Sequence, residues 1–207
     1  MLIAPDRARR LARLVRVLAA GEGLAARVAA AQSRRADRQQ LRRALALQAE
    51  QETGHFQIAQ RLCDALPEPQ GCGPALAALA RLERRIGRDL DAGALASSVV
   101  GLQGVVEHLG EALLERLDPA RYGLTALGPL HRKILAQERG HLRLGAQWLR
   151  ETIGAIDASA QDYFALGEEL GTSVCGLLDD MRVDAPAIWG GVRARLEGWL
   201  AQNRLYP

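Results

Sequence analysis

The sequence predicts an all-α protein, a four-helix bundle with additional helices in a single domain over residues 1–207. Alanine, leucine, arginine, glutamate and glutamine, which favour helices, dominate the composition, and aromatic residues make up only 4%. Runs of alternating polarity rich in valine, isoleucine, threonine and tyrosine, which mark strands, are missing. Instead, apolar residues recur at three- and four-residue steps over long stretches, as amphipathic helices require.

In the first half of the chain, the periodicity predicts two long helices and a shorter third one. Pro5 and Asp6 are typical of a helix start, and a polar turn over 33–38 separates the first helix from the second. The proline- and glycine-rich stretch 67–74 ends the second helix and divides the chain into two halves. The predicted ranges are about 5–32, 39–66 and 75–90.

In the second half, the first predicted helix, Leu95–Leu117, is so apolar that we place it in the interior of the bundle. A turn around Asp118, Pro119 and Gly123 follows it. Three more helices are predicted, over about 129–153, 158–183 and 186–204.

The pentapeptide Gln-Glu-x-Gly-His occurs twice, at residues 51–55 and 137–141. Glu52 and Glu138 within these copies are 86 residues apart, and nearly the same offset, 85 residues, relates Glu22 to Glu107. Each half of the chain is therefore a helix with one glutamate followed by a helix with Glu-x-x-His.

The spacing within each half places these residues at one height in the bundle. A helix rises about 1.5 Å per residue, so ten to fourteen residues up and as many down bring the single glutamate level with the Glu-x-x-His of the next helix. Residues at i and i+3 share a helical face, so the glutamate and histidine of each copy point to the same place. We expect four carboxylates and two imidazoles to meet.

This set of side chains predicts a pair of metal ions. Carboxylates suit iron or manganese and can bridge two ions, imidazole adds a nitrogen ligand, and four carboxylates left in a core without metal would be very costly. We predict two iron ions, with a manganese–iron pair as the alternative that these ligands also accept. The predicted ligands are Glu22, Glu52, His55, Glu107, Glu138 and His141.

Other polar residues near these positions have less certain roles. Glu111 and Gln103 each lie one turn from Glu107; for Glu111 we favour an ion-paired or supporting role over ligation, and Gln103 stays open between the same roles. His108 points about 100° away from Glu107, and His131 lies near a helix start, so we expect both to be structural or exposed. Packing or capping is the default role for the three tyrosines, Tyr122, Tyr163 and Tyr206.

Charge, cysteine content and hydropathy limit the class of protein. The net charge of +3 comes from arginines spread along several helices, and because no aromatic residues interleave with them as stacking partners, we favour solvated faces over a nucleic-acid surface. Three scattered cysteines without a CxxC pair argue against a disulfide framework or a cysteine-bound metal. No stretch approaches 18 uncharged apolar residues. We therefore expect a soluble, cytoplasmic protein that does not enter a membrane.

Two single glutamates and two Glu-x-x-His pairs resemble the ligand set of the ferritin-like di-iron and di-manganese proteins. Ferritins and rubrerythrins fit poorly, because the former do not need the extra helix 75–90 and the latter normally add a CxxC-containing domain. Motif spacing, and the continuation of the last motif as His141–Leu149, resemble the cyanobacterial aldehyde-deformylating oxygenases over about residues 14–200. Bacterial tRNA hydroxylases and demethoxyubiquinone hydroxylases are similar in ligand plan.

The resemblance implies O2 activation at a reduced di-iron centre. The first hypothesis is an oxygenase or oxidase acting on a small or lipid-like organic substrate, with electrons from an external reductase or ferredoxin and a monomeric or homodimeric state. The second hypothesis is a ferroxidase or peroxide-scavenging iron protein. The third is a tRNA-modifying hydroxylase, which rests on the resemblance and on the arginines around the first turn.

Overall fold

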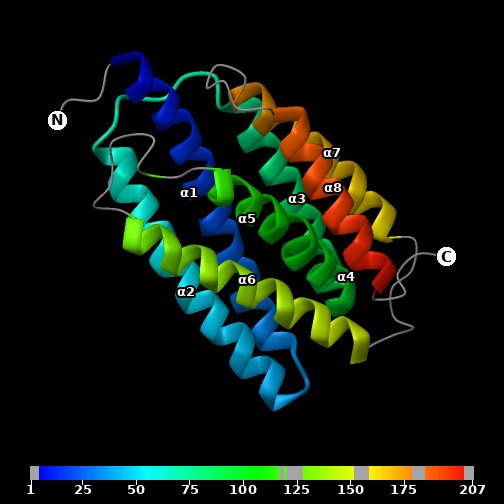
Figure 1. Cartoon of the computed structure of the whole chain (residues 1–207). Coiled ribbons are helices and arrows are strands. Elements are labelled where there is room, and N and C mark those ends of the chain that lie inside the picture. The colour runs from blue at the N-terminus through cyan, green and yellow to red at the C-terminus, as the bar shows by residue number, and fades with distance from the viewer. Residues whose placement is uncertain (1–4, 117–118, 120–127, 152–158, 179–184, 203–207) are drawn as a thin grey trace.

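A computed structural model shows the chain as an assembly of helices in which the longest run roughly side by side (Figure 1). It describes residues 5–116, 119, 128–151, 159–178 and 185–202, and no strand occurs among them. The predicted all-α class is confirmed. The helices are α1 (Pro5–Arg35), α2 (Gln39–Asp64), α3 (Gly73–Asp91), α4 (Leu95–Val99), η1 (Val100–Val106), α5 (Glu107–Arg116), α6 (Gly128–Glu151), α7 (Ser159–Leu178) and α8 (Ala185–Gln202).

Four helical segments form the inner bundle. α1 and α2 pack against each other as a hairpin, the run α4–η1–α5 passes through the middle, and α6 packs on α5 and α2. α3 and α7 pack on each other and on α1, while α8 packs on α5 and α7 (Figure 1). The core is made by apolar side chains that these elements bury completely, such as Leu14, Leu45, Leu82 and Leu102. No helix in the described ranges combines the length and hydropathy needed to cross a bilayer.

Side chains at the first turn close the α1–α2 hairpin. Ser33 Oγ donates to the carbonyl of Arg42, and the guanidinium of Arg42 donates twice to the carbonyl of Ala36, at 2.8 and 3.1 Å. Arg35 pairs with Asp91 at the end of α3. Two arginines of this stretch thus stabilise the fold itself, which weakens their value as evidence for a nucleic-acid surface.

The middle helix departs from the continuous α-helix predicted for Leu95–Leu117, because residues 100–106 form a π-helix. Gly101, in its first turn, faces α3 and α7 so closely that an added Cβ would lie 2.6 Å from Ile86 Cγ1 and still nearer to the ring of Tyr163. Tyr163 is fully buried and donates to Asp89 Oδ2 at 2.7 Å, a packing role as predicted. The wider π-turn ends where Glu107 begins α5, so it directly precedes a predicted ligand.

Candidate metal centre

The structure brings all six predicted ligands together inside the bundle. Glu22 comes from α1 and Glu107 from α5, while α2 and α6 each supply one Glu-x-x-His pair. Five of the six are buried, and the Glu22 side chain is 14% exposed. The helical-hairpin argument from spacing therefore predicted the convergence correctly.

The donors form two overlapping groups, in each of which all donor atoms lie within 4.8 Å of one another. Glu52 and Glu138 belong to both groups, so each could contribute to holding an ion in either group. Glu22 and His55 complete one group, and Glu107 and His141 complete the other. The groups are Glu22, Glu52, His55 and Glu138, and Glu52, Glu107, Glu138 and His141.

Both histidines direct their Nδ1 atoms at the carboxylates. His55 Nδ1 lies 3.1 Å from Glu52 Oε2, 3.2 Å from Glu138 Oε1 and 3.3 Å from Glu22 Oε2. His141 Nδ1 lies 2.7 Å from Glu52 Oε1. Nδ1 is therefore the nitrogen that would bind metal in each case.

The Nε2 atoms bind glutamines in a crossed pattern. His55 Nε2 lies 2.9 Å from Gln137 Oε1, and His141 Nε2 lies 2.8 Å from Gln51 Oε1. Each glutamine is the first residue of the pentapeptide in the other half of the chain. An amide oxygen only accepts, so Nε2 carries the proton and Nδ1 is left for metal. The repeated glutamine was visible in the sequence, but its crossed partner was not.

The other polar residues singled out in the sequence support the site. Glu111 accepts from Arg139 at 3.0 Å and from Arg195 at 3.2 Å, an ion-paired role. Gln103 is buried and donates to Gln48, which in turn donates to the predicted ligand Glu107.

The two histidines outside the predicted ligand set contact backbone carbonyl groups. His108 is buried and its ring nitrogen lies 3.0 Å from the Gln103 carbonyl, and burial lowers its pKa. His131 is half-buried and donates to the Leu114 carbonyl at 2.7 Å. Tyr122 and Tyr206 lie outside the described residues.

Burial and neighbouring charges shift the pKa values of three of the glutamates and one of the histidines. Burial raises the pKa of Glu22 and of Glu107, and neighbouring carboxylates add to the increase. Burial also opposes ionisation of Glu52, yet contacts with His141 and His55 outweigh it and lower its pKa to about 2. Contacts with Glu138, Glu22 and Glu52 likewise overcome burial and raise the pKa of His55 to about 12.

The arrangement fits a pair of cations. Within the described structure, Glu52 Oε1 and Glu138 Oε1 are buried and form no hydrogen bond with the geometry that one requires, although His141 Nδ1 lies 2.7 Å from the former and His55 Nδ1 3.2 Å from the latter. Buried acceptors in native proteins normally have partners, and a cation satisfies a carboxylate oxygen better than any neutral group here. Four carboxylates also balance the charge of two divalent ions. Both donor groups are therefore suited to hold a metal ion.

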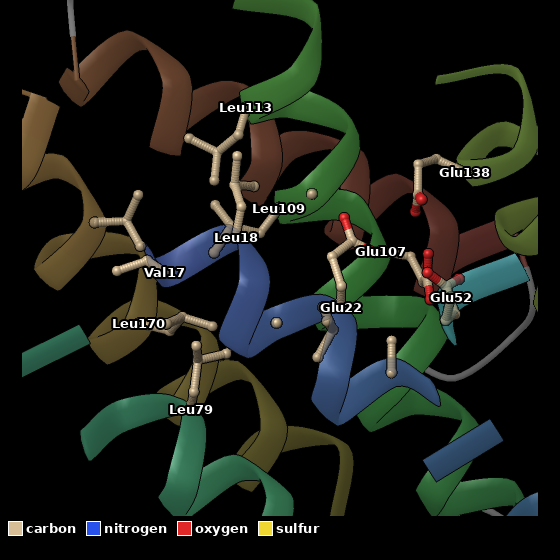
Figure 2. A pocket seen from close by; sticks show the side chains of 15 residues that line it. Val17, Leu18, Glu22, Glu52, Leu79, Glu107, Leu109, Leu113, Glu138 and Leu170 are labelled. Atoms are coloured by element: carbon tan, nitrogen blue, oxygen red, sulfur yellow. The ribbon is translucent and has the colours of Figure 1, made fainter. Parts of the chain in front are cut away.

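Two cavities adjoin the site. The smaller, about 40 Å³, lies between the four carboxylates and a wall of leucine and valine side chains from α1, α3, α5 and α7 (Figure 2). The larger, about 280 Å³, is almost entirely apolar and runs between α1, α2 and α6. It reaches Glu22 and His55, and its lining includes Leu18, Ile58 and Ile134.

A solved structure of a Synechococcus protein, described as having aldehyde deformylating oxidase activity, resembles this one with a TM-score of 0.77. The match covers 97% of this chain and 92% of that chain, with 18% sequence identity. The fold is ferritin-like. This likeness confirms the predicted fold, a ferritin-like four-helix bundle with additional helices, which the resemblance of the ligand set implied. The sequence matches no protein-family model and no curated protein sequence.

Proposed function

We propose that the protein is a non-haem di-iron enzyme that activates O2 and oxidises a small or lipid-like organic substrate, with electrons from a separate reductase or ferredoxin. One observation carries the proposal: two donor groups share Glu52 and Glu138, and an apolar cavity ends on the ligand pair Glu22 and His55. Ferritin-like proteins with this ligand plan hold two iron or manganese ions.

The six ligands would hold the ions, and a bound ferrous pair would supply the electrons and the Lewis acidity for reducing dioxygen. The chain's own residues position and shield the two ions. Glu52 and Glu138 set the two positions side by side, and the crossed glutamines keep each Nδ1 directed at them. Buried surroundings exclude water, which protects reactive species from side reactions.

The larger cavity supports an apolar substrate. Its walls are leucine, isoleucine, valine and alanine side chains, and the polar groups on its lining are Glu22, His55 and His131. A substrate with a hydrocarbon body and one polar end would bury its body there and bring its polar end to the metal ligands. The activity named for the Synechococcus protein makes aldehydes of increasing chain length the first compounds to test.

The test begins with metal content and a single turnover. Purified protein loaded with Fe(II) should hold close to two ions per chain, and Glu52→Ala and Glu138→Ala should each lose this stoichiometry, because each removes a shared ligand. Exposure to O2 with an aldehyde should then yield product without reductase and none without O2. Full metal content with no product from any substrate class, and Fe(II) oxidation that continues far beyond two ions, would instead favour the ferroxidase.

A cavity variant tests the substrate path separately. Leu62→Trp fills the larger cavity and should weaken turnover of long substrates more than of short ones, with metal content unchanged. The matched control is Leu47→Trp on the same helix, since Leu47 is 54% exposed and should tolerate the change. Equal effects of both variants on all chain lengths would contradict this path.

A further inference from the structure

A chain of buried amides leads away from Glu107. Gln48 Nε2 donates to Glu107 Oε1 at 2.9 Å, and Gln103 Nε2 donates to Gln48 Oε1 at 3.0 Å. Gln103 Nε2 also contacts Gln32 Oε1 at 3.4 Å, and Gln32 Nε2 donates to Ser98 Oγ at 3.2 Å. These side chains come from α1, α2, α4 and η1, and each is at most 1% exposed, apart from the ligand itself at 2%.

The side-chain amides of this hydrogen-bonded series can be oriented in only one way. Gln48 must present its NH2 group to the carboxylate, so its oxygen faces Gln103, which must in turn present its own NH2 group. Within the described structure Gln103 Oε1 has no hydrogen-bond partner, a cost that the arrangement tolerates. Turning the Gln103 amide round would set oxygen against oxygen at both neighbours, so the amide hydrogens stay directed along the chain towards Glu107.

Glu22, the counterpart of Glu107 in the first half, has no such support. Its carboxylate lies 3.3 Å from His55 Nδ1 and contacts the carboxylate of Glu52, but among the described residues no amide or hydroxyl group donates to it. It is also the one ligand with appreciable exposure, and it lines both cavities.

The internal repeat shows what stands in place of the amides. Applying the offsets between the halves, the position equivalent to Gln48 is Ile134, and the position equivalent to Gln103 is Leu18. Both line the larger cavity beside Glu22. Apolar side chains and open space therefore replace the amide chain in the half of the site that faces the cavity.

We propose that Gln48, backed by Gln103, is a positioning residue that makes the two metal positions unequal. It ties Oε1 of Glu107, leaves Oε2 beside His141 at 3.4 Å, and so holds this carboxylate in a single terminal orientation. Glu22 lacks such an amide and borders both cavities, so it can change its orientation more readily than Glu107, and the position of Glu22 and His55 is where an exogenous ligand binds. This inference rests on the proposed function, since it assumes that the six residues bind two ions.

The test is a double-mutant cycle read out by Co(II) binding, followed by the optical bands of the bound ion. In a Glu22→Ala background the remaining ion is the one held by Glu107 and His141, and adding Gln48→Met should weaken its binding about 10–100-fold, the usual effect of losing a ligand's hydrogen-bond partner. In a Glu107→Ala background, adding Gln48→Met should leave the remaining ion within about twofold, because additive effects are expected for groups that do not interact.

Further variants keep the result interpretable. Gln57→Met, an exposed position on α2, is the matched control and should change neither affinity. If Gln48→Met does not fold, Gln103→Met replaces it and should weaken the same ion by a smaller factor, since the donor to Glu107 stays but loses its support. Equal weakening of both ions, or of neither, overturns the inference. Failure of the unmodified protein to bind two Co(II) ions would overturn the proposed function itself.

Discussion

Loading the centre with metal should expel protons, and His55 is the clearest source. Its Nε2 donates to Gln137, while its Nδ1 lies within 3.3 Å of oxygens from Glu52, Glu138 and Glu22. Those contacts raise the pKa of His55 to about 12, so the ring carries both protons at neutral pH. Nδ1 is also the atom that would bind metal, and it can do so only after its proton has left.

The expected magnitude follows from this proton count. At pH 7 to 8, His55 should release about one proton per chain on metal binding, and Glu22 and Glu107, whose pKa values burial raises, add to it to the extent that they are protonated. Each proton released makes metal affinity rise about tenfold per pH unit, which is about 1.4 kcal/mol. The affinity should therefore increase by at least tenfold between pH 7 and pH 8.

The assay is calorimetric titration of metal-free protein with Mn(II), which avoids protons from iron oxidation. Titrations at one pH in two buffers of different ionisation enthalpy give the number of protons released. His55→Gln cannot carry the extra proton and should release fewer, by up to about one, because Glu22 takes up part of that proton once the imidazole no longer lowers its pKa. The reasoning is refuted if the unmodified protein releases no proton at pH 7 to 8, or if His55→Gln releases as many.

Three further predictions concern metal affinity, helix packing and the pH dependence of stability. Gln51→Leu, in the first pentapeptide, should weaken the ion held by His141 of the second about 10–100-fold, measured by Co(II) titration; weakening of the other ion alone would contradict the crossed pairing. Gly101→Ala should lower the free energy of unfolding by roughly 1–3 kcal/mol through overpacking, whereas Gly87→Ala, with open space around it, should raise it by about 0.5–1 kcal/mol in denaturant titrations. The pKa of His55 in the folded protein is about 12, above its unfolded value of about 6.5, so its stabilising contribution is complete below pH 6.5 and declines as the pH rises towards 12. The melting temperature of protein from which metal has been removed should therefore fall from pH 7 to pH 9. A rise in the melting temperature would contradict the assignment.

Local periodicity predicted most of the fold. The apolar steps, the prolines at 67–74 and the polar first turn place helix ends within a few residues of those observed, because these signals act on neighbouring residues along one helix. The π-turn at 100–106 was not predicted, because the apolar periodicity of this stretch does not distinguish it from an α-helix, and the close approach of Gly101 to Tyr163 joins it to a distant helix, α7. Contacts between distant segments leave no trace in the periodicity of one segment.

The sequence likewise predicted the residues of the candidate site but not the hydrogen bonds that support them. Residues three apart on a helix and the repeat offset located all six predicted ligands, although their binding of metal stays a prediction until it is measured. The hydrogen bond from His141 to Gln51 joins residues 90 apart and required the tertiary structure. Gln48 gave a weaker signal, a polar residue in an apolar stretch, which says that a partner exists but not which one.

The repeat is most informative where its two halves differ. Glutamates, histidines and the crossed glutamines recur in both halves, and these are the residues that a symmetric pair of metal positions needs. Gln48 and Gln103 do not recur, and their equivalents, Ile134 and Leu18, line the cavity. A duplicated scaffold with identical supports would offer both ions to solvent or substrate equally. Replacing amides by apolar side chains on one side both opens space for a substrate and frees Glu22 to move, so a single departure from the repeat accounts for the position of the cavity and for the unequal ligands.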